Sequence, residues 1–348
     1  MKTKIKHCWL LCLLAFCSCS SWIDIKPSDR LSEGMLFEDR QGFEKAINGV
    51  YVGLTDRALY GRTLSAGIID FMAQYYTYGS GSDMNSMVGA YRYEEDEIKA
   101  IFQSAWEKAY ALIVNCNIII EKCDAKREVL SDVYYGLYKG EAIALRAMLH
   151  LDMLRLFGPV YDDASKTEKS IPYVTNSDSE ISPLLSAEEI LNFVIEDLKV
   201  ALDLLKSVDP ILTEGVRNES NNDGGDNSLY YRQYRMNYYA VKALLARAYA
   251  WGHDGRNALI VAEEILREVQ VEGAEIFPFV EHSVAVDPSV PDRVFSTEVI
   301  FSLYDSYRGT EIQDKLFIPT VDQIYTFSSR RLEMGREYSF YASENDYR

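Results

Sequence analysis

The sequence has few of the residues on which most metal and redox sites depend, with 4 histidines and 6 cysteines among 348 residues. His150, His253 and His282 are spaced far from one another and from every cysteine. This spacing matches no ordinary zinc site, and no metal is expected. Cys116 and Cys123 lie two turns apart on an expected helix, or about 10.5 Å along its axis. Because a disulfide needs Cα atoms within about 7 Å of each other, both are interpreted as buried thiols.

Recognisable catalytic motifs are also missing. The chain contains no Gly-rich phosphate loop, no Ser-x-x-Lys, no Gly-x-Ser-x-Gly and no His-x-x-x-His. The adjacent carboxylates Asp162 and Asp163 would need a correctly spaced third group for glycosidase chemistry, and chance pairs are expected among 53 acidic residues. No catalytic residue and no cofactor is therefore assigned, and the protein is interpreted as one that is not an enzyme.

Positive charge is scarce. The chain has 36 Lys and Arg against 53 Asp and Glu, a formal charge of −17, and loss of Lys2, Lys4 and Lys6 with a leader would take it to about −20. A surface this acidic repels phosphate backbones, so nucleic acid is not an expected partner. Strongly anionic substrates are disfavoured as well, unless local positive patches override the mean field.

A hydrophobic run of membrane-spanning length is absent, since about 20 residues are needed. A short apolar run that ends at Phe16 follows a lysine-rich start, and this pattern predicts an export signal over residues 1–18. Small residues around a cysteine mark the acylation site of bacterial lipoproteins. Cys19 is the better site because Ser18 before it is small, whereas bulky Phe16 precedes Cys17. Acylation at Cys17 and an ordinary cleaved signal remain as alternatives.

Helical periodicity, by contrast, is abundant. The capping box Ser186-Ala-Glu-Glu189 marks one helix start, and Gly158-Pro159 marks one helix end. Two helices joined by a turn at 253–255 form a hairpin of about 35 residues, close to the tetratricopeptide period. The pattern predicts an all-α fold of tetratricopeptide-like helical hairpins with long irregular loops and minor β-structure, including a strand at 298–304. The expected scaffold helices occupy residues 39–55, 98–157, 186–207 and 236–270.

The segments between these helices are rich in tyrosine, of which the chain has 25. Segments 56–97 and 271–340 are too long for linkers and too aromatic for disorder, so they are expected to bind ligand. Small-residue packing of Gly140, Ala144 and Ala147 is expected between the helices of 98–157. Tyrosine rings can stack on sugar rings, although packing of the same rings against the scaffold is the alternative interpretation. The candidate ligand-binding residues are Tyr75, Tyr76, Tyr78 and Tyr91 in the early loop and Tyr304 and Tyr307 in the late one.

Short motifs occur in a consistent order along the whole chain after the signal. They are Cys19-Ser-Ser-Trp-Ile-Asp-Ile-Lys-Pro27, Ala46-Ile-Asn-Gly-Val-Tyr51, Trp106-Glu-Lys-Ala-Tyr110 with Asn115 and Asn117, Gly140-Glu-Ala-Ile-Ala-Leu-Arg-Ala147, Arg155-Leu-Phe-Gly-Pro159 with Ile171-Pro172-Tyr173, Ala243-Leu-Leu-Ala-Arg-Ala-Tyr249, Glu298-Val-Ile-Phe-Ser302 and Asp346-Tyr-Arg348. In this order they resemble the SusD/RagB family of nutrient-uptake lipoproteins of Gram-negative outer membranes.

The resemblance implies one SusD-like domain over 19–348, lipid-anchored through Cys19 in the outer membrane and facing the cell exterior. It also implies a SusC-like TonB-dependent transporter as partner and an oligosaccharide or another nutrient as ligand. The alternative is a helical-repeat lipoprotein that acts as a scaffold for protein–protein interactions. Family members continue in further helices beyond the point matched by Arg348. A truncated gene, a fragment and a divergent short member are the alternatives, each leaving the last repeat short of a packing partner.

Overall fold

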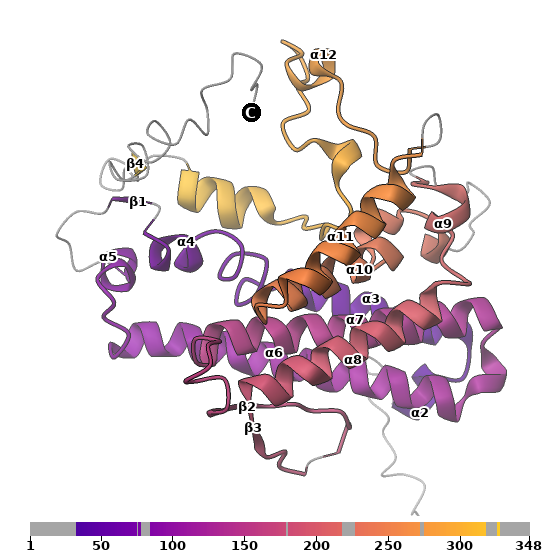
Figure 1. Cartoon of the computed structure of the whole chain (residues 1–348), viewed down its shortest axis with the longest axis horizontal. Coiled ribbons are helices and arrows are strands. Elements are labelled where there is room, and N and C mark those ends of the chain that lie inside the picture. The colour runs from indigo at the N-terminus through magenta and orange to yellow at the C-terminus, as the bar shows by residue number, and fades with distance from the viewer. Residues whose placement is uncertain are drawn as a thin grey trace, which may run out of the picture.

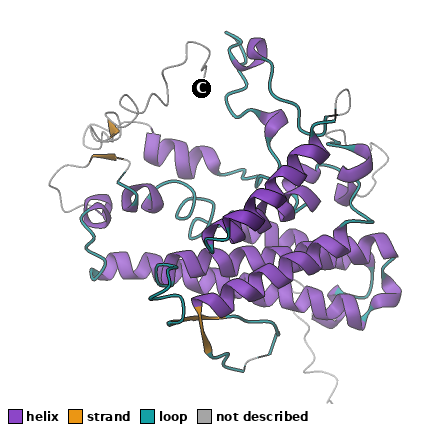
Figure 2. Cartoon of the chain, viewed as in Figure 1, coloured by secondary structure: helices purple, strands orange, loops and turns teal. Residues whose placement is uncertain are grey.

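Helices predominate and strands are short in the part of the chain that the structure describes (Figure 2). The computed structural model describes residues 33–74, 76–77, 84–178, 180–217, 227–271, 275–317 and 326–327, with the backbone alone described at 33–34, 76–77, 85, 227, 313, 315–317 and 326–327. The long helices are α3 (Arg40–Leu54), α6 (Asp96–Ala125), α7 (Asp132–Phe157), α8 (Ala187–Leu205), α10 (Tyr238–Trp251) and α11 (Gly255–Val269).

Shorter elements occupy the intervening segments. The short helices are α2 (Glu33–Leu36), α4 (Ile68–Met72), α5 (Met84–Gly89), α9 (Ile211–Glu214) and α12 (His282–Ala285), with 3-10 turns η1 (Arg127–Val129), η2 (Asn227–Leu229), η3 (Arg232–Tyr234) and η4 (Ser296–Glu298) and a π-helix η5 (Gly309–Phe317). Strand β1 (Tyr76–Thr77) pairs antiparallel with β4 (Thr326–Phe327), and β2 (Lys169–Pro172) pairs antiparallel with β3 (Leu184–Ser186). None of the helices in this part of the chain combines the length and apolarity needed to cross a membrane.

The long helices stack as hairpins, and the expected all-α, tetratricopeptide-like architecture is confirmed (Figure 1). Helix α7 is the centre of the stack, with α6 and α8 packed against it, α3 against α6, α10 against α8 and α11 against α10. The capping box of α8 forms as its residues predict: the Ser186 backbone N–H donates to Glu189 Oε2 at 2.8 Å, and the Glu189 N–H donates to Ser186 Oγ at 3.3 Å. Helix α7 also ends at Phe157, directly before Gly158-Pro159, as that pair predicts.

Small residues allow α8 to approach α7 closely. A Cβ at Gly136 would lie 2.7 Å from a Val208 methyl, and one at Gly140 would lie 2.9 Å from Leu205 Cγ. Distances this short leave no room for a larger side chain. The expectation that Gly140 packs between the helices of 98–157 is therefore wrong, because this glycine faces the next helix, α8.

The expected strand at 298–304 is not formed. After η4 the chain is irregular through Tyr304. Side chains make the hydrogen bonds that a neighbouring strand would have made: Gln233 Nε2 donates to Val299 O at 2.6 Å, and Asn237 Nδ2 donates to Ile300 O at 2.8 Å. Apolar residues predominate in this segment, but no strand among the described residues pairs with it.

The early loop is folded against the start of α6. Ile68 and Phe71 of α4, Val88 of α5 and Ile98 of α6 form a small apolar cluster separate from the main core. The described part of segment 56–97 thus packs its short helices α4 and α5 against the start of α6 (Figure 1).

A buried ionic cluster joins three segments that are distant in the sequence. The Arg232 side chain is only 1% exposed and forms three charge-assisted hydrogen bonds. Nε and Nη2 donate to the two carboxylate oxygens of Asp209 at 2.9 and 3.0 Å, and Nη1 donates to Glu141 Oε1 at 2.6 Å. Burial alone would lower the pKa of Arg232, but the two carboxylates raise it above its ordinary value. A second charge of α7 is paired as well, since Arg146 Nη2 lies 2.8 Å from Asp197 Oδ1.

We expect Arg232→Met to lower the free energy of unfolding by about 3–5 kcal/mol, because two buried carboxylates would lose their counter-charge. Arg92→Met is the matched control: the Arg92–Glu95 pair is exposed, at 49% and 43%, and its loss should cost less than about 1 kcal/mol. Urea unfolding followed by circular dichroism measures both. An Arg232→Met protein as stable as the control would contradict the assigned role of the cluster.

His150 is buried as a neutral ring, and burial lowers its pKa to about 3. Its Nδ1 lies 2.9 Å from Arg146 O, and its Nε2 accepts from the Val174 N–H at 3.0 Å. Between this folded-state pKa and the ordinary value of about 6.5, the unfolded chain binds the proton and the folded chain does not. The contribution of His150 to stability is therefore complete above about pH 6.5 and declines as the pH falls towards 3.

Comparison with His150→Gln isolates this effect, since Gln offers Oε1 to the Val174 N–H but does not titrate. The stability difference between wild type and variant should shrink by about 1.4 kcal/mol per pH unit below pH 6. Urea unfolding of wild type and variant at a series of pH values measures it. A difference for His150→Gln that does not change with pH would exclude a neutral buried ring.

Candidate functional site

The turn η3 presents two tyrosines from a fixed backbone. Tyr231 immediately precedes buried Arg232 and has a left-handed backbone with φ of 51°, which is uncommon for a residue other than glycine. The Tyr231 N–H donates to Arg217 O at 2.8 Å, and the Tyr234 N–H donates to Tyr231 O at 2.8 Å. Because Arg232 is anchored to Asp209 and Glu141, the rings on either side of it are held relative to α7 and α8.

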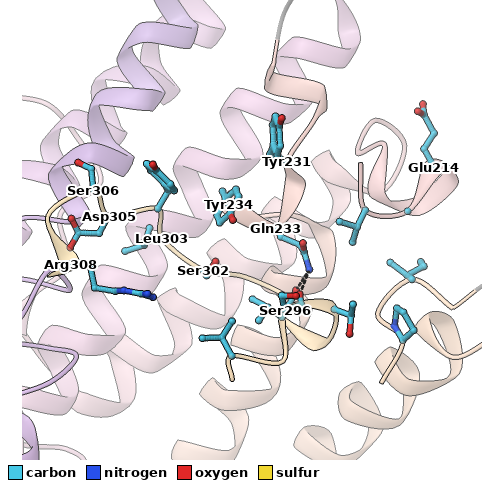
Figure 3. Close-up of a pocket in the computed structure, with 18 of the residues that line it drawn as sticks. Glu214, Tyr231, Gln233, Tyr234, Ser296, Ser302, Leu303, Asp305, Ser306 and Arg308 are labelled. Carbon is cyan, nitrogen blue, oxygen red and sulfur yellow. Dashed lines mark hydrogen bonds between the residues drawn. The ribbon is translucent and has the colours of Figure 1, made fainter. Parts of the chain in front are cut away.

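A second segment, residues 296–309, lies opposite η3. Gln233 is 7% exposed, and its Nε2 donates to Ser296 O at 3.2 Å and to Val299 O at 2.6 Å (Figure 3). The Ser302 N–H donates to the backbone carbonyl of Gln233 at 2.9 Å. Tyr304 follows two residues later. Its ring centroid lies 6.1 Å from that of Tyr234, in an edge-to-face arrangement at 76°.

A cleft of about 1180 Å³ lies between these two segments (Figure 3). The rings of Tyr231, Tyr234 and Tyr304 form an aromatic row, with Tyr231 and Tyr234 centroids 6.5 Å apart. Tyr304 is 75% exposed and Tyr234 is 42% exposed, so both offer surface to a ligand. The charged residues of the lining are Glu214, Glu275, Asp305 and Arg308.

This lining is suited to noncovalent binding. Exposed aromatic rings supply apolar stacking faces, while carboxylates, a guanidinium and backbone groups supply hydrogen bonds around them. Glu214 forms an ion pair with Arg217 beside the cleft. The lining contains neither histidine nor cysteine, and no cluster of three metal-ligating side chains occurs among the described residues of the chain.

The tyrosines predicted from the sequence are distributed over different places. Tyr304 lines the cleft, whereas Tyr307 is 71% exposed but outside the lining. Tyr91 is 61% exposed at the start of the α6 region, edge-to-face with Tyr93 at 6.0 Å, and also lies outside the lining. Of the early group, Tyr75 and Tyr78 lie outside the described residues, as does Cys19. Tyr76 has its backbone in β1, opposite Phe327.

Sequence reasoning did not identify Tyr231, Tyr234, Gln233 or Arg308 as site residues. A usable signal was present, because Tyr230-Tyr231-Arg-Gln-Tyr234 places three aromatics just before the helix cap Asn237. Aromatic residues that directly precede a helix are held by the rigid helix start, so their rings can be fixed at the surface.

The adjacent carboxylates considered for hydrolysis are engaged in a turn. Asp162 Oδ1 accepts hydrogen bonds from the Ala164 N–H, the Ser165 N–H and the Ser165 hydroxyl at 2.9–3.0 Å. The bonds from Ser165 lower the pKa of Asp162 below its ordinary value. Asp163 pairs with Lys166 at 3.1 Å. The geometry gives this pair a structural role in the loop after α7.

Known proteins resemble the chain most clearly in its first half. A family model described as SusD-like, starch-binding and associating with outer membrane, matches residues 21–212. A SusD-like protein of Formosa agariphila is 26% identical over 194 residues, which cover 53% of this chain and 34% of that protein. The chain thus spans about a third of this curated relative.

Solved structures share the fold at lower sequence identity. A SusD superfamily protein of Bacteroides thetaiotaomicron has a TM-score of 0.64 at 18% identity, covering 86% of this chain and 62% of that one. A SusD-like carbohydrate binding protein of Bacteroides vulgatus has a TM-score of 0.51 at 20% identity, covering 67% and 46%. At these identities the likeness describes the fold alone. The cleft, formed by residues beyond 212, lies outside the match to the family model.

Proposed function

The chain belongs to the SusD-like family, and on that premise we propose that it is a lipid-anchored outer-membrane protein that binds a glycan outside the cell and delivers it to a SusC-type TonB-dependent transporter. The proposed glycan site is the cleft between η3 and residues 296–309. The observation that carries this proposal is the pair Tyr234 and Tyr304, whose rings are exposed yet held in place by buried polar contacts.

Stacking is the proposed mode of recognition. Sugar rings present faces of C–H bonds that pack on aromatic planes, and their hydroxyls bond to nearby polar groups. A volume of about 1180 Å³ exceeds the range of about 300–1,000 Å³ typical of small-molecule pockets, which favours an extended oligosaccharide. Three carboxylates against one guanidinium in the lining favour a neutral glycan over an acidic one.

The proposed activity is binding without turnover. Glycoside hydrolysis needs two carboxyl groups flanking the scissile bond at a defined separation. The adjacent pair Asp162 and Asp163 does not supply them, because both are bound within their own turn and neither lines the cleft. Release of reducing ends from bound glycan by the purified protein would reject this part of the proposal.

A role as a scaffold for protein partners is the second candidate, and one observation favours it. Helix α11 leaves Leu259, Ile260 and Leu266 exposed by 58%, 43% and 53%. Apolar side chains on the outer helix of a repeat stack are typical of a surface that binds another helix. The two functions are separable, because tyrosine substitutions in the cleft should leave a partner on α11 bound.

We expect Tyr304→Ala to weaken glycan affinity by about tenfold or more, since an exposed stacking face at the centre of a site carries much of the binding free energy. Isothermal titration calorimetry with neutral glycans, beginning with maltooligosaccharides because the family model is described as starch-binding, measures it.

Tyr307→Ala is the matched control, because Tyr307 is almost as exposed as Tyr304 but lies outside the lining. Its affinity should stay within about twofold of wild type. Equal losses for both variants would move the site beyond the cleft and towards the wider tyrosine group of the late loop. Absence of binding to every neutral glycan by folded wild-type protein would reject glycan capture.

Membrane attachment is tested at the two cysteines of the proposed lipoprotein signal. In a Gram-negative host, wild type and Cys17→Ser should fractionate with the outer membrane, while Cys19→Ser should be released, because acylation supplies the anchor. Membrane fractionation followed by immunoblotting measures this. The reverse result would assign the lipid to Cys17, and a soluble wild type would contradict the anchor.

A further inference from the structure

We propose that Gln233 is the positioning residue of the cleft: its buried side-chain amide sets the distance and tilt between the tyrosines of η3 and Tyr304. The inference rests on the proposed function, since it explains how the glycan site is held ready to bind. Gln233 lines the cleft but is only 7% exposed, and it would act mainly through Tyr234 and Tyr304.

Gln233 connects the turn η3 to the opposite segment directly. Gln233 forms three hydrogen bonds to residues 296–302, from Nε2 to Ser296 O and Val299 O and from the Ser302 N–H to its own carbonyl. Figure 3 shows the amide reaching across from η3 to Ser296 on the opposite segment. Tyr234 is the next residue after Gln233, and Tyr304 lies two residues after Ser302. Both rings are therefore within two residues of the bonded groups.

The turn η3 is itself held rigidly by the residues on either side of Gln233. Arg232 precedes Gln233 and is fixed by two carboxylates, Glu141 in α7 and Asp209 shortly after α8. Asn237, which caps α10 through the Ala240 N–H at 3.0 Å, adds a hydrogen bond to Ile300 O. The side-chain amides of Gln233 and Asn237 thus fix residues 296–302 relative to the helical scaffold.

The backbone is left-handed at one residue on each side of the Gln233 bridge. Tyr231 and Phe295 both have positive φ, 51° and 53°, and each immediately precedes one of the 3-10 turns that Gln233 joins. Left-handed backbone at bulky residues is rare and is retained where the surrounding structure imposes it, often at functional sites. Two such residues at the ends of one side-chain bridge indicate that the shape of this junction is constrained.

A purely stabilising role explains these bonds less well. Ser296 is exposed and lines the cleft together with Val299, so water can reach this region of the segment. If the amide were removed, solvent could bind the two carbonyls and the chain could still fold. What would be lost is the fixed spacing of the rings, and a less preorganised site binds more weakly.

The direct test is Gln233→Met, which keeps side-chain length and removes the donor. Affinity for a neutral oligosaccharide should fall by about tenfold. Hydrogen exchange, measured by mass spectrometry on wild type and variant without ligand, should rise in the peptide covering 296–304 and stay unchanged in α7. Tyr304→Ala is the reference, with affinity lost and exchange in the 296–304 peptide near wild type.

Gln233→Glu supplies a readout that a general loss of stability would not give. A protonated Glu side chain can donate one hydrogen bond in place of Nε2, whereas the ionised form would repel both carbonyls. Burial beside carbonyl oxygens raises the pKa of such a carboxyl. The glycan affinity of Gln233→Glu, relative to that of wild type, should therefore recover as the pH is lowered from 8 to 5. The other charged groups around the cleft are shared by both proteins, namely Glu214, Glu275, Asp292, Glu298, Asp305 and Arg308.

The outcomes separate this inference from the proposed function. If Tyr304→Ala loses affinity while Gln233→Met and Gln233→Glu bind like wild type at both pH values, the positioning role is overturned and the glycan site stands. If wild type binds no glycan, or Tyr304→Ala binds like wild type, the site assignment fails. In that case hydrogen exchange alone tests the positioning role. Unchanged protection of residues 296–304 in Gln233→Met would overturn it.

Discussion

The buried guanidinium of Arg232 is the constraint on which both the helical stack and the cleft depend. It joins Glu141, in the middle of α7, to Asp209 beyond α8 and to the turn that carries the cleft tyrosines. A charge that is 1% exposed is tolerable only when matched, and the planar fork of arginine binds one carboxylate through two bonds and the other through a third. The network continues through Tyr51, whose hydroxyl donates to Glu141 at 2.8 Å and accepts from the Met236 N–H. One residue thereby fixes the helices and the loop together.

The helices could be predicted from the sequence because their signals are local. Residues within one turn of each other decide where α8 begins, through the reciprocal bonds of Ser186 and Glu189. The end of α7 follows from Gly158-Pro159, and its burial follows from an apolar surface on all sides. The burial of Cys116 and Cys123 follows from their helical register, and burial raises the pKa of both thiols to about 12. None of these conclusions needs contacts between distant residues.

The cleft depends on distant contacts, and the sequence indicated only part of it. Gln233 bonds to Ser296 across 63 positions, and Arg232 bonds to Glu141 across 91. No periodicity encodes such pairs. Tyr304 could be predicted as exposed because it lies in an irregular late segment, whereas Tyr231 and Tyr234 are presented by a turn whose position only the ion cluster defines. The strand expected at 298–304 is not formed for a related reason, since an apolar segment does not reveal whether a partner strand or a side-chain amide will bind its backbone.

Binding that backbone with side-chain amides has a consequence for the rings nearby. An irregular segment held by apolar burial would place its aromatic side chains in the core, where they could not contact a ligand. Here Ile300 and Phe301 do pack against the core, but Gln233 and Asn237 add polar bonds to residues 296–302, and Tyr304 stays 75% exposed. Exposure and fixed position are usually in conflict, because a freely moving side chain loses conformational entropy when a ligand immobilises it. The rigid scaffold, the buried arginine and the bridging amide together reduce that loss, and in this way the helical stack carries an ordered aromatic surface.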